Sequence, residues 1–535
     1  NGSFVIDLSQ ELLTVNISTP GVGPFTFNVE NFDNVVGTVN TDSITGNDND
    51  NVFTGSTGDD SINGLGGDDT VDYSGLGAGI TLLTQGQIAK APFTVGDTVF
   101  GLLGTDLTTG LETIIGDASQ TNTINGIADG EFLANGDNAS FDIDLKAETF
   151  VLAPEVPNQF FPAALTFTVQ NFSEVVGTAN NDTIKGSDSA DVLDGEAGDD
   201  FVFGRKGNDN VAGGEGNDTL RGDSGNDTVS GGAGNDKIDG GGNADVLSGG
   251  DGNDFISGKN GADLIDGGAG DDILLGNAAN DTINGSIGND TINGGGRNDT
   301  LDYTGLGGSV SLGSQGVITK TEVATGDLGT DQLIGSGIGT AANPIVNSIE
   351  RIIGDVGEGI VNTIDGAASD AMDPRASFVI NLSQDSLVIN FTDGIPNLAT
   401  QTYVVENFDN VVGTDNNDVI FGNDNDNVFT GSSGFDFLNG GDGFDTADYS
   451  GLDTDITLTA TGLVNKGDLG IDLLRSINEV VADAGQTNTI DAAFGEISQI
   501  SADLGAGTLE VALFTPNVGP LFFDVANFDD VRGSF

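Results

Sequence analysis

The chain of 535 residues contains no cysteine, no histidine and no tryptophan, and it has a single methionine. Without cysteine and histidine there is no disulfide bond, no thiolate nucleophile, no zinc site built on those side chains and no Ser-His-Asp triad. The sequence also has no run of about 18 apolar residues, the length that a membrane-spanning helix needs. These absences leave few enzyme classes, and the sequence predicts that the protein is not an enzyme.

Basic residues are scarce as well, since 15 Lys and Arg face 83 Asp and Glu and give a net charge of −68. This charge excludes a nucleic-acid binder and disfavours anionic membrane surfaces. Chains this acidic are usually disordered, yet 36% of the residues are hydrophobic and 31 are Phe. Such a chain can fold if a divalent cation offsets the repulsion among its carboxylates.

Glycine and aspartate follow a nine-residue period, which is the sign of a repeat architecture. Residues 177–302 divide into fourteen consecutive nonapeptides, and residues 37–72 and 413–448 into four each. Position 1 is Gly in all twenty-two, position 6 is Asp in all but two (Asn51 and Asn427), and position 8 is a bulky apolar residue in all but one (Ala447).

Each position has a physical role in the expected fold. Glycine supplies turn conformations with positive φ. The last three residues of a unit form a short strand with the middle side chain inward, so that Ile238, Leu247, Ile256 and Ile265 would stack in one column. The Asp begins that strand beside the turn, where carboxylates of successive coils converge with turn carbonyls. About six hard oxygens in flexible geometry suit Ca²⁺ better than Mg²⁺.

The units resemble the GGxGxDxUx repeats of the RTX, or hemolysin-type calcium-binding, family. This resemblance implies an all-β fold, a right-handed parallel β-roll with two units per coil, and roughly one Ca²⁺ per nonapeptide in the turns. It also implies the metal ligands Asp42, Asp60, Asp69, Asp182, Asp191, Asp200, Asp209, Asp218, Asp227, Asp236, Asp245, Asp254, Asp263, Asp272, Asp281, Asp290, Asp299, Asp418, Asp436 and Asp445. Three departures weaken the pattern at position 4: Asn243 still suits a left-handed turn, whereas Ala279 and Arg297 suit it less well.

A longer repeat surrounds the nonapeptides. Its copies begin near Phe4, Phe141 and Phe378, each is followed by an NF-containing motif that leads into a nonapeptide tract, and each tract ends on Asp-Tyr. We predict modules 1–139, 140–373 and 374–495 and a partial module 496–535. Alternating polar and apolar residues predict strands in the flanks, either wider β-solenoid coils that continue the rolls or β-sandwich inserts. Residues 110–115 and 473–481 suggest single short helical turns. The whole would be an elongated rod.

The function we expect is that of a secreted, calcium-binding structural protein. Its rolls fold on Ca²⁺ and stack head to tail, module start Gly2-Ser3-Phe4 against module end Gly533-Ser534-Phe535, into an extracellular fibril, sheath or S-layer at the cell surface. A resemblance to surface-fibril proteins of the oscillin type supports this expectation. The alternatives are the stalk of an RTX adhesin, which binds cell-surface polysaccharide, and the secretion-related region of a larger exported protein.

Overall fold

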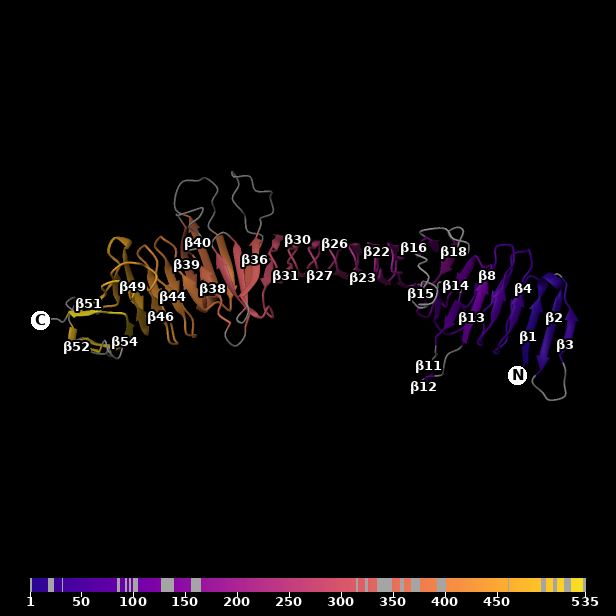
Figure 1. Cartoon of the computed structure of the whole chain (residues 1–535), viewed down its shortest axis with the longest axis horizontal. Helices are drawn as coiled ribbons and strands as arrows, with labels where there is room; N and C mark the ends of the chain where they lie inside the picture. Colours follow the sequence, from indigo (N-terminus) through magenta and orange to yellow (C-terminus); the bar gives the residue numbers. More distant parts are fainter. Residues whose placement is uncertain are drawn as a thin grey trace. The chain divides into compact units, whose positions relative to one another are not determined.

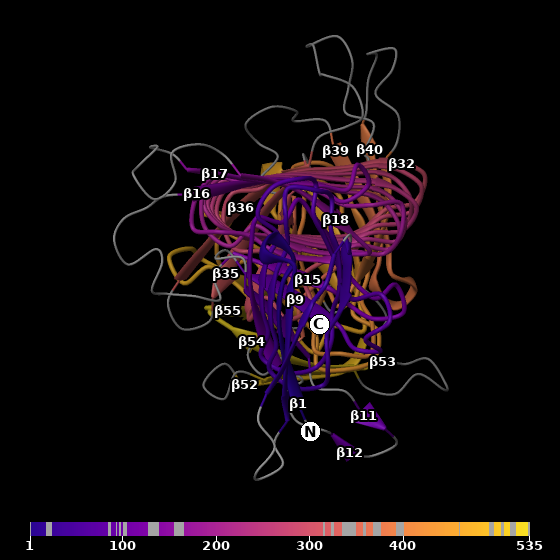
Figure 2. The ribbon, with the colours of Figure 1, turned by 90° about the vertical axis from the view of Figure 1, so that its right-hand side faces the viewer.

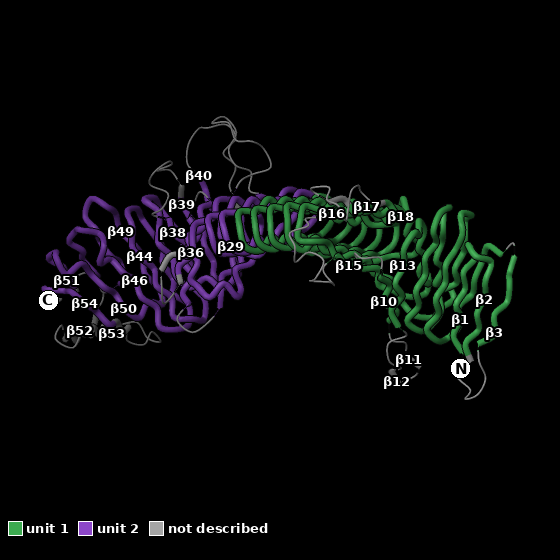
Figure 3. Tube along the Cα trace, turned by 45° about the vertical axis from the view of Figure 1, so that its right-hand side comes forward, with its two compact units in different colours: residues 1–263 green, residues 264–535 purple. Residues whose placement is uncertain are grey.

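The structure is a computed structural model with two compact units, residues 1–263 and residues 264–535 (Figure 3). Each unit is described by itself. The unit boundary lies inside the central nonapeptide tract, and the predicted modules stay a prediction. The structure describes residues 2–17, 24–30, 32–83, 87–91, 94–95, 98–99, 104–126, 139–154, 165–313, 316–322, 326–333, 349–356, 360–366, 376–391, 401–459, 461–491, 497–503, 508–513 and 521–532.

In unit 1 the central tract forms a parallel β-roll, because strands eighteen residues apart pair in register. The two nonapeptides of one coil supply one strand to each of two sheets. The first sheet holds β20 (Thr183–Lys185), β22 (Phe201–Lys206), β24 (Thr219–Ser224), β26 (Lys237–Gly242) and β28 (Phe255–Asn260). The second holds β19 (Glu174–Val176), β21 (Val192–Asp194), β23 (Asn210–Glu215), β25 (Thr228–Ala233) and β27 (Val246–Asp251). The expected two units per coil are therefore confirmed.

Unit 2 continues the same pattern of pairing. Its nonapeptide strands in residues 264–302 are β29 (Leu264–Ala269), β30 (Ile273–Ala278), β31 (Thr282–Asn284), β32 (Thr291–Gly296) and β33 (Thr300–Asp302). The two short tracts are built alike, from β4 (Asn34–Val36), β5 (Ser43–Thr45), β6 (Val52–Thr54), β7 (Ser61–Asn63) and β8 (Thr70–Asp72) in unit 1 and from β42 (Asn410–Val412), β43 (Val419–Phe421), β44 (Val428–Thr430), β45 (Phe437–Asn439) and β46 (Thr446–Asp448) in unit 2.

The core of the roll is made of the apolar side chains at position 8. Ile238 lies opposite Ile256 in one sheet, whereas Leu247 lies opposite Val229 in the other, and all four are at most 1% exposed. The inward orientation is confirmed. The single column that we predicted is wrong, because a coil of two units gives two facing columns. Figure 2, turned toward the stacking direction, shows the nonapeptide coils of unit 1 as superimposed flattened loops.

Positive φ is found at positions 2 and 4 of the units, for example at Gly214 and Gly216. Ala279 and Arg297 adopt it too, with φ of 97° and 99°, although a Cβ disfavours this region. The Gly at position 1 has another role than the one predicted. A Cβ at Gly213 would come within 3.0 Å of Oδ2 of Asp218 and of the carbonyl oxygen of Gly231 in the next coil, so close approach excludes a side chain there.

The flanks extend the roll sheets through three-stranded antiparallel meanders. One set precedes each tract: β1 (Gly2–Asp7), β2 (Leu12–Ile17) and β3 (Phe25–Asn28); β16 (Ala139–Asp144), β17 (Thr149–Pro154) and β18 (Leu165–Gln170); β39 (Ala376–Asn381), β40 (Ser386–Phe391) and β41 (Gln401–Glu406); and, at residues 497–526, β52 (Ile497–Asp503), β53 (Thr508–Leu513) and β54 (Leu521–Ala526). In the first three sets the first strand pairs parallel with a tract strand, as β1 does with β5.

A second set of meanders follows each tract and bears on the site described below. Its members are β9 (Ile80–Leu83), β10 (Gln87–Lys90) and β13 (Gly104–Thr109); β34 (Gly308–Gly313), β35 (Val317–Glu322) and β36 (Gly326–Leu333); and β47 (Thr457–Thr459), β48 (Leu463–Asn465) and β49 (Ile471–Arg475). The third strand pairs parallel with a tract strand: β13 with β7, β36 with β32 and β49 with β45. We call these the exit meanders.

Both flank types therefore continue the sheets, as the solenoid prediction requires, but with an antiparallel middle strand that the sequence did not indicate. In unit 1, Figure 1 shows the flank coils around β1–β8 as wide and the nonapeptide coils at β22–β27 as narrow. The expected helical turns are wrong, since β14 (Thr113–Ile115), β49 and β50 (Glu479–Val481) contain most of those residues and none of the others is helical. Strands β15 (Thr123–Asn125), β37 (Arg351–Ile353), β38 (Thr363–Asp365), β51 (Thr489–Asp491) and β55 (Asp530–Arg532) complete the flank coils. Among the described residues, no helix has the length and apolar character to cross a membrane.

Candidate metal centre

The position-6 aspartates are buried in spite of their charge. None of the twenty predicted ligands is more than 5% exposed, and Asn51 and Asn427 at the same position are fully buried. Since a buried carboxylate is costly unless hydrogen bonds or a cation compensate it, the partners of each oxygen decide what these side chains do.

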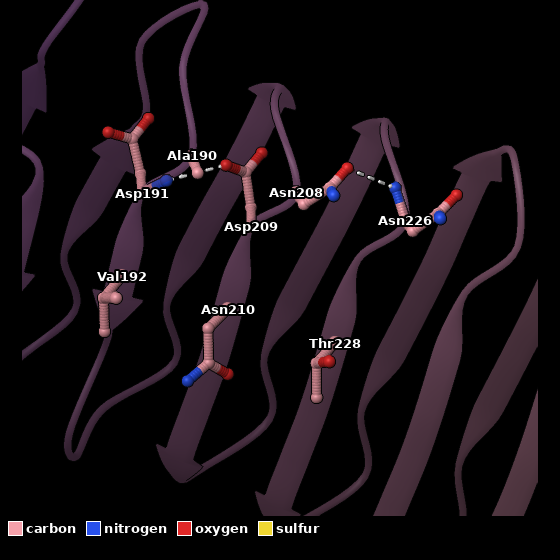
Figure 4. Close-up of a pocket in the computed structure, with 8 residues that line it drawn as sticks. All are labelled: Ala190, Asp191, Val192, Asn208, Asp209, Asn210, Asn226 and Thr228. Atoms are coloured by element: carbon pink, nitrogen blue, oxygen red, sulfur yellow. Dashed lines mark hydrogen bonds between the residues drawn. The ribbon is translucent and has the colours of Figure 1, made fainter.

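In most of these carboxylates, one oxygen joins neighbouring coils. The amide of Asp191 donates a 2.9 Å hydrogen bond to Oδ1 of Asp209 (Figure 4). The amide of Asp209 likewise donates a 2.8 Å bond to Oδ1 of Asp227. The same bond links Asp200 to Asp218 at 2.7 Å. Oδ1 is thus an acceptor for the main chain of the previous coil, and Oδ2 is the oxygen that this contact does not use.

In the largest group of these aspartates, Oδ2 faces the turn. Among the described residues, the Oδ2 atoms of nine have no hydrogen-bond partner and are buried: Asp69, Asp200, Asp209, Asp218, Asp227, Asp236, Asp245, Asp299 and Asp445. Four more aspartates hold the same place in the repeat and are equally buried: Asp254, Asp263, Asp272 and Asp281. A buried acceptor of this kind loses its hydration without replacement, so an ion is the missing partner that the arrangement calls for.

The surroundings of Oδ2 suit a hard cation. A Cβ placed on Gly195 would come within 3.0 Å of Oδ2 of Asp200 and of the carbonyl oxygen of Gly213, so both oxygens face one small space beside the turn. No group of three or more acidic side chains that could hold a metal occurs in the described ranges. An ion here would therefore take main-chain carbonyls together with carboxylates, a mixture that Ca²⁺ accepts and Mg²⁺ accepts poorly.

The pKa values of several of these aspartates are raised, because no positive charge of the described residues lies beside their buried carboxylates. Burial raises the pKa of Asp200, Asp209 and Asp245 to about 7, and hydrogen bonds from the preceding coil only partly oppose it. Burial likewise raises the pKa of Asp236 to about 6. Protons therefore bind these carboxylates tightly, and a divalent cation that takes the same oxygens must compete with them.

A second group, at the start of the tracts, has protein partners on both oxygens. Oδ2 of Asp182 accepts a 2.6 Å hydrogen bond from the amide of Thr178, and Oδ1 accepts one of 2.5 Å from the amide of Phe141. Asp42, Asp191 and Asp418 each accept the corresponding bond from the amide at position 2 of their own unit. The structure thus gives Asp42, Asp182, Asp191 and Asp418 main-chain donors in the place where the main group has none.

The third group comprises Asp60, Asp290 and Asp436, whose Oδ2 atoms face buried lysines that sequence reasoning missed. Lys320 donates from Nζ to Oδ2 of Asp290 at 3.1 Å and to Oδ1 of Asp331 at 2.5 Å, and its side chain is fully buried. Lys90 and Lys466 contact Asp60 and Asp436 in the same way. We call Lys90, Lys320 and Lys466 the seat lysines.

Sequence reasoning also missed Asp106, Asp331 and Asp472. They extend by one coil the ladder of hydrogen bonds that run from position-6 amides to Oδ1 atoms of the next coil. The amides of Asp60, Asp290 and Asp436 donate to their Oδ1 atoms at 3.0–3.1 Å, and the hydroxyls of the tyrosines that end each tract, Tyr73, Tyr303 and Tyr449, donate to their Oδ2 atoms. A signal existed, since each extending Asp stands in a Gly-x-Asp triplet, which is the second half of a nonapeptide turn. The tyrosines are fully buried, in agreement with a role in closing the core.

Comparison with known proteins supports the repeat assignment. The family described as RTX calcium-binding nonapeptide repeat (4 copies) matches residues 36–75, 407–447 and overlapping segments that together run from 176 to 301. No curated protein matches the chain. Repeats of this family bind calcium, and the matched segments include the coils whose Oδ2 atoms face the turns. The nonapeptide tracts of this chain are therefore RTX calcium-binding repeats, arranged as parallel β-rolls.

Proposed function

We propose that this is an exported structural protein whose β-rolls fold as calcium binds. The single observation that carries the proposal is the series of buried Oδ2 atoms that, in the described structure, have no hydrogen-bond partner. Calcium between these oxygens and the turn carbonyls would supply the charge that the chain lacks, because 83 acidic residues face only 15 basic ones.

Calcium then acts as a folding signal. In a calcium-poor cell the carboxylates repel one another and the chain stays unfolded. Outside the cell, the free energy of calcium binding adds to the free energy of folding. RTX proteins are typically exported, and RTX repeats are generally structural rather than catalytic, which agrees with this sequence of events.

We further propose that copies of the chain assemble into an extracellular fibril, sheath or S-layer. An exposed strand edge supports this part: in the described residues of unit 1, β3 pairs only with β2, and Phe25 and Phe27 on it are 49% and 52% exposed. Unpaired edges with apolar side chains favour association with another chain. The adhesin alternative has less support, because all four tyrosines are at most 2% exposed and tryptophan is absent, which leaves neither ring for stacking on sugars.

Far-ultraviolet circular dichroism and electron microscopy of the metal-free and the calcium-loaded chain test the proposal. At pH 8, we expect β structure and fibres only with calcium. An unchanged spectrum after chelation would contradict the role of calcium in folding. Folded, monodisperse particles with calcium would contradict assembly and favour an adhesin stalk or a secretion-related region.

A further inference from the structure

The seat lysines occur once per nonapeptide tract, with the same partners and the same spacing. Nζ of Lys90, Lys320 and Lys466 donates to the carbonyl oxygen of the serine 34 residues earlier, at 2.5–2.7 Å, and contacts Oδ2 of the aspartate 30 residues earlier. These serines, Ser56, Ser286 and Ser432, hold position 2 of the unit whose position 6 is the contacted Asp. All three tracts therefore contain the same arrangement of lysine, serine and aspartate.

The oxygens around each ammonium belong to a repeat turn. Nζ of Lys90 donates to the carbonyl oxygens of Ser56 and Gly58, both at 2.7 Å, and these residues hold positions 2 and 4 of the unit. It also contacts carboxylate oxygens of Asp60, at position 6, and of Asp106, which takes the place of position 6 in the next coil. Carbonyls and carboxylates of two successive coils thus surround one positive charge.

The ammonium occupies the side of the carboxylate that is open elsewhere. In the main group, Oδ2 faces the turn without a hydrogen-bond partner in the described structure, as in Asp218 and Asp227. In the lysine-bearing units Oδ2 faces Nζ. The space beside Gly285 is closed as well, since a Cβ there would collide with the ring of Tyr303, and the same holds for Gly55 with Tyr73 and Gly431 with Tyr449.

The buried lysine and its second aspartate partner both come from the exit meander. Lys320 lies in β35 and Asp331 in β36, while Lys90 ends β10 and Asp106 lies in β13. Each exit meander therefore brings one lysine and one aspartate to the last unit of one column. A fully buried ammonium between two buried carboxylates is stable only because these oxygens satisfy it, so the site is built for a cation.

We propose that the seat lysines are tethered substitutes for calcium. In each tract, the ammonium of Lys90, Lys320 or Lys466 fills the last cation position of one column of turns. It excludes calcium from that position and neutralises the two carboxylates there without a metal ion. Asp60, Asp290 and Asp436, which the repeat pattern marks as calcium ligands, are ligands of an ammonium instead. The inference rests on calcium binding by the other turns, as proposed above.

Substitution of the lysine by methionine, which has a similar length and no charge, tests this. Calcium bound per full-length chain is counted by equilibrium dialysis for the wild type and for Lys90→Met, Lys320→Met and Lys466→Met. We expect each variant to fold only with calcium and to bind one ion more than the wild type. Lys206→Met is the matched control, because the Lys206 side chain is 64% exposed and bridges Asp188 at the surface; its count should equal that of the wild type.

The outcomes separate this inference from the proposed function. A wild-type chain that binds no calcium contradicts the proposed function. If the wild-type chain binds calcium and the methionine variants fold and bind the same number of ions, only the proposal that lysine takes the place of calcium is contradicted. The proposal that lysine takes the place of calcium is also contradicted if none of the three variants folds in excess calcium, since calcium then cannot replace the ammonium.

Discussion

Asp200 and Asp218 are joined by a 2.7 Å hydrogen bond from the amide of the first to Oδ1 of the second, while Oδ2 of Asp218 remains buried beside its own turn. One carboxylate therefore has two roles, since Oδ1 holds adjacent coils in register and Oδ2 awaits a cation. Stability and metal binding depend on the same side chain, and the two roles can be separated by experiment.

Asp218→Asn should remove a calcium ion and leave the coil contact in place, because the amide oxygen still accepts the bond from Asp200. Asn427 also holds position 6 but does not make this bond, because its Oδ1 accepts from the amide of Asn423 in its own unit. We expect the variant to bind about one ion fewer and to need more calcium for folding, as measured by equilibrium dialysis and calcium-titrated circular dichroism. Asp251→Asn, an exposed position outside the ladder, should change neither value.

Gly213→Ala should block the turn. The added methyl group would lie within 3.0 Å of Oδ2 of Asp218 and of the carbonyl oxygen of Gly231, and overpacking of this kind costs about 1–3 kcal/mol. Gly242→Ala is the control, because the nearest atom to its Cβ lies 3.8 Å away. The thermal midpoint with calcium should fall for the first variant only, and equal midpoints would show that the turn tolerates a side chain.

Ala279→Gly should stabilise the calcium-loaded protein by about 1 kcal/mol, since a residue with a Cβ at left-handed φ pays a strain of about 1–3 kcal/mol, and Ala279 has a φ of 97°. Ala244→Gly, an exposed position in the same part of a nonapeptide turn, should be neutral or destabilising, because glycine only adds entropy to the unfolded chain. Chemical unfolding in calcium measures both. A loss of stability in Ala279→Gly would contradict the strain.

Acid should partly replace calcium. The metal-free fold raises the pKa of Asp200, Asp209 and Asp245 from an ordinary 3.8 to about 7, so it binds protons more tightly than the unfolded chain. The resulting stabilisation is complete below about pH 4 and is lost as the pH rises through about 7.

We therefore expect metal-free protein to show more β structure at pH 5 than at pH 8 by circular dichroism, and calcium to bind more tightly at pH 8. A variant with Asn at all three positions should show a weaker dependence on pH. Metal-free protein that is more folded at pH 8 than at pH 5 would contradict the burial of charged Oδ2 atoms.

Much of the roll could be predicted from the sequence, because the nine-residue period fixes both the turn and the inward residue. Two units per coil followed from the RTX resemblance, whereas the burial of position 6 was not predicted. The period alone does not say that Ile238 and Leu247 belong to opposite sheets, since that depends on the number of units per coil.

The flanks and the fate of individual aspartates were harder to predict. The antiparallel strand β35 has the same alternating pattern as a parallel one, so its direction is set only by its pairing with β34 and β36. The difference between Asp290 and Asp299 depends on Lys320, which lies 30 residues from Asp290 in sequence. Thr178 and Asp182 are close in sequence, yet the hydrogen bond between them was visible only in the structure.

Anomalous X-ray diffraction from crystals grown in calcium, recorded at long wavelength, tests the central claim most directly. We predict calcium peaks beside Oδ2 of Asp69, Asp299, Asp445 and the ten aspartates from Asp200 to Asp281 at nine-residue intervals, about thirteen in all. We predict no peak beside Asp60, Asp290 or Asp436. An absence of peaks along the Asp200–Asp245 turns would contradict the account.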